Sequence, residues 1–531
     1  MAAYTDAENR TGSATGAFLL AGIVSAAFAE AIAGTALSLG RGDIIGDAHA
    51  TPDEFAWLDI SYTTLKFMGF VLAAWFMARI EPVRLLIIAS LAIGAACALT
   101  AMTTRLDALM MLRAVQGFAG GILLVGGQTI IFLVYARSSQ PMLQAIFAIG
   151  AVVAPATIAP ALEGWLLDSW SWSWIFFSVA PVSVLAAGLL LIADAPALPR
   201  PSAQPFDWVA CTLIAAAFFC LSYVLSQGSR WNWFEEPRII WSSIAGTGSF
   251  LLLFGWRLLT GTHSIPDASA FRSTNYTFAF IVSFVAGAAL FGSAFLIPSF
   301  AVSVLGFTPS AAGLLLLPSS AFFIFSLLVA ALLIQIHGLP PIAMAPLGIL
   351  MVMTATWMLS GSTSESGAGD MLPAILVRGF GLGFLFLAIT LIAFLNLPRS
   401  SLASGIGIFN IGRQTGGLIG VAGLQTLIDH QAAANFSVLS AHVTAGTSAA
   451  MGRMSATSAL LTSKGVDPAS IEMATTRLLD RAVTLQATVI AFDTAFRSLS
   501  LMFIVVAPVV VCIKIFLNRR SRTREPAMQG R

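Results

Sequence analysis

The sequence contains few charged residues. Only 10% of its 531 residues are Asp, Glu, Lys or Arg, whereas soluble domains carry about 25%. Lysine is the scarcest of these four types, with Lys66, Lys464 and Lys514 as its only occurrences. Because 57% of the residues are hydrophobic, this shortage of charge excludes a soluble core for most of the chain and indicates that lipid surrounds it.

The sequence also lacks the motifs of ATP-driven proteins and of common hydrolases. It has no G-x-x-x-x-G-K-[ST], and therefore no sign of direct ATP use. It has no H-E-x-x-H and no serine nucleophile elbow. The five His and four Cys have no metal-ligand spacing. We therefore expect no enzymatic activity, no metal site and no nucleic-acid partner.

About fourteen apolar stretches fill the chain, each of about twenty residues. A helix of about this length satisfies its own backbone while crossing the ~30 Å hydrocarbon core of a bilayer. The predicted helices are 17–39, 56–78, 83–102, 108–134, 141–166, 172–193, 206–226, 239–260, 275–303, 310–335, 340–360, 370–396, 402–428 and 494–517. Their grouping predicts an all-α polytopic membrane protein with two six-helix bundles and two extra central helices.

This grouping divides the chain into predicted segments. They are an N-terminal tail at 1–16, an N-terminal bundle at 17–193, two linker helices at 194–274, a C-terminal bundle at 275–517 and a basic tail at 518–531. The C-terminal bundle includes a long outer connection, 429–493, that is rich in Ala, Ser and Thr. Residues 471–490 have helical periodicity, so this connection contains either a surface helix or a disordered loop.

Basic residues predict the orientation of the helices. Connections that follow even-numbered helices are rich in arginine, namely Arg79, Arg84, Arg137, Arg200, Arg257, Arg272 and Arg399. Short connections that follow odd-numbered helices are more acidic, as at Asp43 and Asp47. Because cytoplasmic loops carry an excess of Lys and Arg, we expect both termini in the cytoplasm.

Ionisable residues inside the predicted spans are the strongest functional signal. Glu30 and Lys66 lie at similar depths on consecutive helices, and Asp59 lies about two turns closer to the outside. A charge at the bilayer centre costs at least ~2.5 kcal/mol, so such residues usually face a cavity or a partner. Proton coupling at Glu30, recognition of a charged substrate and a static Glu30–Lys66 ion pair all remain open.

Other polar residues stand beside glycine stripes, which let neighbouring helices approach closely. Arg113 and Gln116 precede Gly117-x-x-x-Gly121, and Arg378 begins Arg378-Gly-Phe-Gly-Leu-Gly. The predicted helix 402–428 carries three further polar candidates, Asn410, Arg413 and Gln414. Glycine stripes by themselves indicate helix packing, but an arginine beside each one suggests a function.

The predicted helix 141–166 contains two prolines and a carboxylate. Pro155 and Pro160 remove backbone donors and are expected to bend the helix. Glu163, followed by Gly164, places a second acidic residue near the outer end of this helix.

These motifs resemble those of the major facilitator superfamily, in particular its fourteen-helix drug:proton antiporter branch of the EmrB/QacA type. Arg113-Ala-Val-Gln-Gly resembles the branch's helix-4 motif, whose arginine is implicated in proton coupling. The Pro155 and Pro160 region resembles the helix-5 antiporter motif, and Asn410-x-x-Arg-Gln-x-Gly-Gly resembles the helix-13 signature. The resemblance covers about residues 17–517.

The sequence departs from this pattern at three places. The loop after the second helix keeps Arg79 and Arg84, but Ala78 stands where the family motif has Asp. The helix-5 motif has Glu163-Gly164 where Gly-Gly is expected, and Lys66 is unusual for the branch. Coupling or substrate can therefore differ from those of a typical member.

The resemblance implies a proton-coupled secondary transporter that exports drugs or other amphipathic or aromatic small molecules across the cell inner membrane. It implies no cofactor besides the proton gradient, and possible periplasmic adaptor and outer-membrane channel partners. The alternative is a narrow-specificity transporter of an organic anion or metabolite, which Lys66 and Arg113 would favour. A membrane enzyme or sensor would need a soluble domain or a catalytic constellation, and the sequence has neither.

Overall fold

The computed structural model describes residues 13–193, 205–260, 267–443 and 447–528. Most of the predicted N-terminal tail, 1–16, lies outside these ranges. All the regular secondary structure in the described ranges is helical, which confirms the predicted all-α class.

The first six spans form one bundle. Its helices are α2 (Ser13–Thr35), α4 (Pro52–Met77), α5 (Pro82–Thr100), α6 (Leu106–Val134), the bent span α7 (Gln140–Ala148), η2 (Ile149–Ile158) and α8 (Ala159–Ser169), and α9 (Trp172–Ile192). A short helix, α3 (Arg41–Asp47), connects α2 to α4. These boundaries agree with the sequence-based helices to within about four residues.

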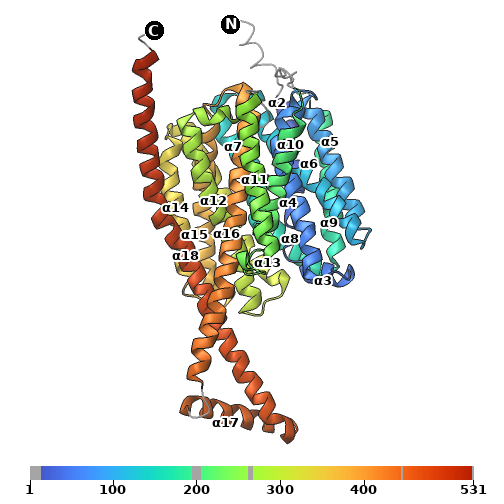
Figure 1. Cartoon of the computed structure of the whole chain (residues 1–531), viewed down its shortest axis with the longest axis vertical. Helices are drawn as coiled ribbons and strands as arrows, with labels where there is room; N and C mark the ends of the chain where they lie inside the picture. Colours follow the sequence, from blue (N-terminus) through green and yellow to red (C-terminus); the bar gives the residue numbers. More distant parts are fainter. Residues whose placement is uncertain (1–12, 194–204, 261–266, 444–446, 529–531) are drawn as a thin grey trace.

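The remaining spans form a second bundle and a helical pair. The pair is α10 (Trp208–Gln227) and α11 (Pro237–Thr260), and the second bundle comprises α12 (Thr274–Ser303), α13 (Pro309–His337), α14 (Met344–Leu359), α15 (Ala368–Phe394), α16 (Arg399–His442) and α18 (Pro468–Met528). Figure 1 shows the two bundles side by side, with α10 and α11 lying across their junction.

Thirteen helical segments among the described residues are long and apolar enough to cross a membrane. The helix α16 is not among them, because Asn410, Arg413 and Gln414 interrupt its apolar sequence. It nevertheless packs against α12, α18 and α4. With α16, the body has the predicted fourteen helical spans.

The segment 429–493 differs from the prediction. Instead of a long connection, α16 continues to His442, α17 spans Ser448–Ser463 and α18 begins at Pro468, so the predicted helix over 471–490 is part of α18. The physical reason is composition, because Ala-rich sequence with few Gly or Pro favours helix. Gly465, at φ +76°, ends α17 with a conformation that glycine adopts readily. Figure 1 shows these helices projecting beyond the body.

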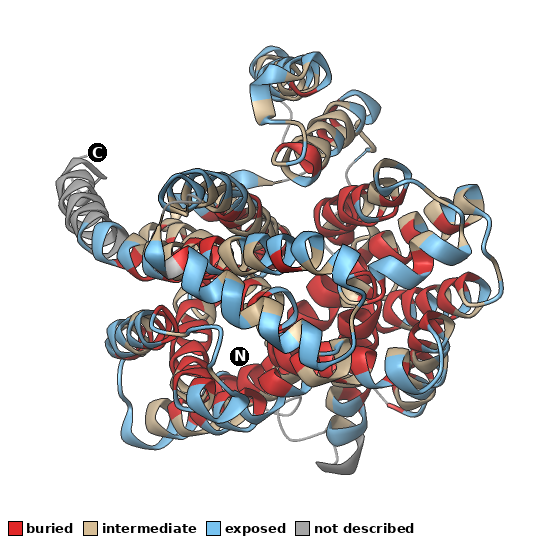
Figure 2. Ribbon diagram, turned by 90° about the horizontal axis from the view of Figure 1, so that it is seen from below, coloured by how far each residue is buried: buried red, intermediate tan, exposed pale blue. Residues whose placement is uncertain are grey.

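The pair α10 and α11 is central in the sequence but peripheral in the fold. Ala210 and Ile214 of α10 and Leu253 of α11 form a small core with α4. The rest of α11 presents large apolar side chains outward, including Phe250, Leu252 and Phe254. Figure 2 shows buried residues gathered where helices face one another, with exposed residues along the outside. Exposed apolar faces of this kind are expected where lipid is the solvent.

Pro155 changes the helical geometry of the bent span. It lies inside the π-helical segment η2, and Pro160 lies in the first turn of α8. Proline cannot donate a backbone hydrogen bond, and a wider turn accommodates the interruption. The irregularity predicted from these two prolines therefore takes the form of a π-helical segment, and the span continues through it.

Glycines allow this bent span to contact the other bundle. A Cβ on Gly164 would lie 2.6 Å from the carbonyl oxygen of Pro309 on α13. Gly313 of α13 is packed as tightly against the carbonyl oxygen of Pro160. The predicted motif residues Pro160 and Gly164 thus form part of the contact between the bundles.

The helix α2 begins, and α18 ends, at the same end of the body (Figure 1). An even number of spans requires this arrangement. The arginine-rich connections at Arg79, Arg137 and Arg399 follow even-numbered spans and therefore lie at that end.

The close packing of α4 on α6 predicts a sharp difference between two glycine substitutions. A Cβ on Gly121 would lie 2.5 Å from the backbone oxygen of Lys66, whereas a Cβ on Gly188 of α9 would meet no atom within 4 Å. We expect Gly121→Ala to lower the free energy of unfolding by about 1–3 kcal/mol, a typical cost of overpacking. Thermal unfolding of the purified variants in detergent measures this, and equal melting temperatures for Gly121→Ala and Gly188→Ala would contradict the packing.

Candidate functional site

A buried ion pair lies in the middle of the N-terminal bundle. The Nζ atom of Lys66 on α4 is 2.5 Å from Oε1 of Glu30 on α2. The Tyr62 hydroxyl donates a hydrogen bond of 2.8 Å to the same carboxylate oxygen. Glu30 is 2% exposed and Lys66 8% exposed, so the pair is shielded from solvent. Electrostatic attraction is stronger in such a buried environment than in water.

Helical spacing and small residues build this pair. Tyr62 and Lys66 are four residues apart and therefore lie on one face of α4. Opposite them, a Cβ on Gly120 of α6 would lie 2.7 Å from Cγ of Glu30, and a Cβ on Gly34 of α2 would lie 2.8 Å from the Tyr62 hydroxyl. Larger residues at these glycines would occupy the space of the pair.

Arg113 extends the site along α6. Its Nη1 atom donates to the carbonyl oxygen of Ala33 at 2.6 Å and to Oε1 of Gln116 at 3.0 Å. Its guanidinium carbon lies 4.1 Å from the centre of the Tyr62 ring, a cation–π distance. Gln116 in turn donates to the Thr100 hydroxyl at 2.8 Å. The Nε and Nη2 atoms of Arg113 are buried without a hydrogen-bond partner.

The other two acidic candidates flank Arg113, which interacts electrostatically with both Asp59 and Glu163. Asp59 is exposed and lies on the same face of α4 as Tyr62 and Lys66, nearer the start of the helix. Glu163 is fully buried and receives contacts from α2. The structure therefore connects four of the five predicted coupling residues, Glu30, Lys66, Arg113 and Gln116, through Tyr62. Asp59 and Glu163 make no hydrogen bond or ion pair to these residues among the described residues.

The C-terminal bundle has an arginine that pairs with no acidic side chain in the part of the chain that the structure describes. Arg378 on α15 is fully buried and donates to the Ser293 hydroxyl at 2.7 Å and to the Leu290 carbonyl oxygen at 3.4 Å. Among the described residues, the only buried acidic side chains are Glu30 and Glu163. Both buried acidic side chains among the described residues therefore lie in the N-terminal half.

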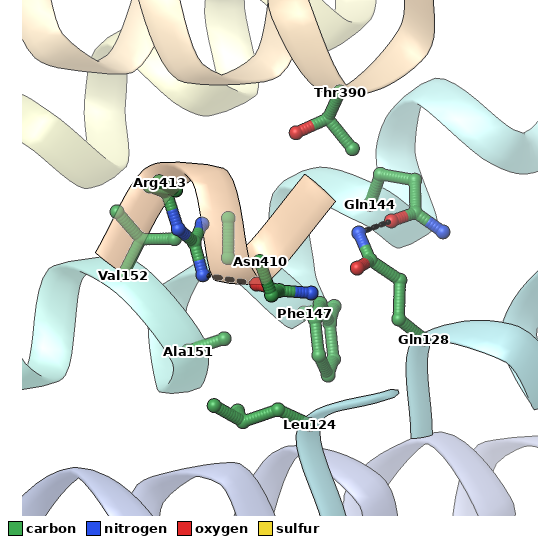
Figure 3. Close-up of a pocket in the computed structure, with 10 residues that line it drawn as sticks. Leu124, Gln128, Gln144, Phe147, Ala151, Val152, Thr390, Asn410 and Arg413 are labelled. Atoms are coloured by element: carbon green, nitrogen blue, oxygen red, sulfur yellow. Dashed lines mark hydrogen bonds between the residues drawn. The ribbon is translucent and has the colours of Figure 1, made fainter. Parts of the chain in front are cut away.

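A small cavity of about 20 Å³, lined by polar and apolar side chains, lies between the bundles (Figure 3). Arg413 and Asn410 of α16 line one side and are joined by a hydrogen bond of 2.6 Å. Gln128 of α6 and Gln144 of α7, joined at 3.1 Å, line the other. Gln414 does not line it. This space holds about one water molecule, whereas ligand pockets measure ~300–1,000 Å³. The cavity is therefore too small for a drug-sized ligand in this conformation.

Arg413 forms no ion pair within 4.0 Å among the described residues, and the charge of Glu30 acts on it only at longer range across the interface between the bundles. Closer to the termini, the rings of Phe132 on α6 and Phe394 on α15 are 5.7 Å apart, and Arg137 donates to Asn396. The bundles are therefore in contact at the end where α2 begins.

The arginines after the second span make local contacts. The Arg79 guanidinium stacks on Trp75 of its own helix at 3.7 Å. Arg84 pairs with Glu81 at 2.8 Å on the surface. These contacts lie within or beside single helices.

Four polar residues around the ion pair and the cavity were not predicted from the sequence. Tyr62 could have been found from its position one turn before Lys66 on the same face. Thr100, Gln128 and Gln144 carry no comparable signal, because a lone polar residue in an apolar helix does not reveal its partner.

Comparison with known proteins identifies the family. Residues 17–421, more than half of the chain, match the family model of the Major Facilitator Superfamily. The chain belongs to the Major Facilitator Superfamily. This confirms the superfamily predicted from the helix-4, helix-5 and helix-13 motifs, and it makes the protein a multi-pass membrane transporter of small molecules rather than an enzyme.

Several relatives from bacteria resemble most of the chain. The fatty acid resistance protein FarB of Neisseria gonorrhoeae is 23% identical over 91% of this chain and 93% of its own length. The multidrug export protein EmrB of Haemophilus influenzae is 25% identical over 79% of this chain and 81% of its own length. EmrB of Escherichia coli K12 is 24% identical over 75% of this chain and 77% of its own length. These relatives agree with the predicted EmrB-type branch.

The buried pair predicts non-additive effects on stability. Removing one partner of a buried ion pair leaves an uncompensated charge and costs about 3–5 kcal/mol, whereas replacing both partners costs much less. We expect Glu30→Gln and Lys66→Met each to lower the melting temperature of the purified protein in detergent. The double variant should be more stable than either single variant. A double variant that loses the sum of the two single losses would show that the side chains do not interact.

Proposed function

We propose that the protein exports amphipathic or aromatic small molecules across the cytoplasmic membrane in exchange for protons, with Glu30 as a proton-binding group. The observation that carries this proposal is the buried Glu30 carboxylate, which is held by Lys66 and Tyr62 and interacts electrostatically with Arg413 of the other bundle. The names of the EmrB relatives, which describe multidrug export, support an exported drug-like substrate.

The chemistry of the pair supports coupling between protonation and bundle movement. A proton on Glu30 removes the negative charge that attracts Lys66 within the N-terminal bundle and Arg413 across the interface. The interaction between the bundles at this level is then weaker, so protonation favours a conformation in which they separate. A bound proton shifts such an equilibrium only through its different affinity for the two conformations, and the change of charge at Glu30 supplies that difference.

Asp59 supports a route for protons. It shares a helix face with Tyr62 and Lys66 and lies nearer the start of α4, so it would stand between that end of the membrane and the buried pair. Protons would enter past Asp59 from the end opposite to the termini. At the other end, Phe132 of α6 and Phe394 of α15 hold the two bundles in contact.

Membrane placement and partners are part of the same proposal. The arginine-rich end, where α2 begins and α18 ends, would face the cytoplasm, and the membrane would be the inner membrane of a bacterial cell. The projecting part of α16, α17 and α18 would then extend into the periplasm. There it could meet a periplasmic adaptor that leads to an outer-membrane channel. The proton gradient would drive transport without ATP or a cofactor.

A second candidate function is transport of one amphipathic organic anion. The cationic groups Lys66, Arg113 and Arg413 near the interface favour it, and so does the name of the FarB relative, a fatty acid resistance protein. A fluorescent long-chain carboxylate and a cationic dye, tested as substrates under the same conditions, distinguish the two candidates.

The first test is efflux of ethidium from energised cells that express the protein. We expect efflux that a protonophore abolishes, and Glu30→Gln should reduce its rate at least tenfold because the amide cannot exchange a proton. The matched control is Glu365→Gln, which makes the same chemical change at an exposed position between α14 and α15 and should transport as the wild type does.

Efflux from Glu30→Gln cells at the wild-type rate, at equal expression, would remove Glu30 from the coupling mechanism. If wild-type cells export the long-chain carboxylate but not ethidium, the second candidate replaces the first.

A further inference from the structure

Glu163 is the second fully buried carboxyl group, and its surroundings differ from those of Glu30. Its Oε1 atom is 2.5 Å from the Thr35 hydroxyl, and its Oε2 atom is 3.1 Å from the Ser38 hydroxyl. No Lys, Arg or His nitrogen lies within 4.0 Å of it among the described residues, whereas Glu30 has Lys66 at 2.5 Å. Burying a charged carboxylate without a paired cation is costly, and such a group usually takes a proton instead.

A count of hydroxyl protons points the same way. The Thr35 hydroxyl lies 2.9 Å from the Ala31 carbonyl oxygen as well as 2.5 Å from Glu163. A hydroxyl has one proton to donate, and Thr in a helix commonly donates it to the carbonyl four residues earlier. A proton on the carboxyl group, donated to the Thr35 oxygen, would leave the Thr35 proton for the Ala31 carbonyl oxygen, so both contacts are satisfied when Glu163 is protonated.

Few charged groups surround Glu163. The helix α8 packs against α2, α9, α13 and η2. Among these, α9 and η2 contain no ionisable residue, and α13 contains only His337 at its far end. The only ionisable residue of α2 is Glu30, which pairs with Lys66. On α8 itself, Asp168 is exposed. Among the described residues, Arg113 of α6 is the cation whose charge acts on Glu163.

Arg113 has the capacity to receive a carboxylate. Its Nη1 atom is used by Ala33 and Gln116, but Nε and Nη2 are buried and have no hydrogen-bond partner. A guanidinium can hold a carboxylate through two parallel hydrogen bonds, and this edge of Arg113 is unused in the present conformation.

We propose that Glu163 is a second proton-binding group, separate from Glu30, and that Arg113 takes the place of its proton in another conformation of the transporter. When the proton leaves, the O–H bond of the carboxyl group breaks, water on the open side of the transporter accepts the proton, and the carboxylate pairs with the free edge of Arg113. The proposal rests on proton-coupled transport and adds a second proton to each transport cycle.

Infrared difference spectroscopy of the purified full-length protein in lipid vesicles tests the proposal. The difference between acidic and alkaline spectra contains the carbonyl stretch of each carboxylic acid that loses its proton. We expect Glu163→Gln to remove one carbonyl component, and Glu30→Gln to remove a different one. The exposed control Glu365→Gln should leave both in place.

A spectrum of Glu163→Gln that retains every wild-type component would overturn the proposal. If that variant does not fold, Thr35→Val serves instead. It removes the hydrogen-bond partner but not the carboxyl group, so it should move the Glu163 component to higher frequency, and an unmoved component would equally contradict the proposal. Failure of ethidium efflux in the wild type would refute the proposed function alone, because the spectra report proton binding without transport.

Discussion

The main constraint on the structure is the free-energy cost of burying charged side chains inside a membrane. Glu30 and Lys66 offset that cost for each other at 2.5 Å, and Tyr62 supplies a third contact. The pair can form only because α2, α4 and α6 approach closely, and glycines such as Gly120 and Gly121 permit that approach. The glycines and the ion pair therefore depend on each other: close packing of α2, α4 and α6 holds the charged side chains of Glu30 and Lys66 in contact.

The two bundles contribute unequally to this arrangement. The N-terminal bundle holds both buried carboxyl groups, whereas Arg378 in the C-terminal bundle is held by a hydroxyl and a carbonyl oxygen. Arg413 carries the electrostatic connection between the halves, because it lines the small cavity at the interface and acts on Glu30. In the proposed mechanism, a change of charge on Glu30 therefore acts on Arg413 of the other bundle.

The sequence predicted the membrane spans but not all of the contacts between distant helices, and each outcome has a physical reason. Length and apolar composition predicted the spans, since crossing lipid leaves few alternatives. The shared depth of Glu30 and Lys66 made an ion pair between them one of the open interpretations. Within 429–493, periodicity indicated a helix only at 471–490 and left a disordered loop as the alternative. The extension of α16 and the helix α17 were not predicted, because Ala-rich helices of mixed polarity carry no hydropathy signal. The contacts of Glu163 with Thr35 and Ser38 depend on how two distant helices pack, which spacing along the chain does not reveal.

The central claim is that substrate and protons move in opposite directions through a mechanism that uses Glu30. The most direct test reconstitutes the protein in vesicles that contain a pH-sensitive dye and imposes a substrate gradient without a proton gradient. The account predicts that protons move against the substrate flow through the wild type, and that Glu30→Gln shows no such movement. Substrate transport through the wild type without any proton movement would contradict it.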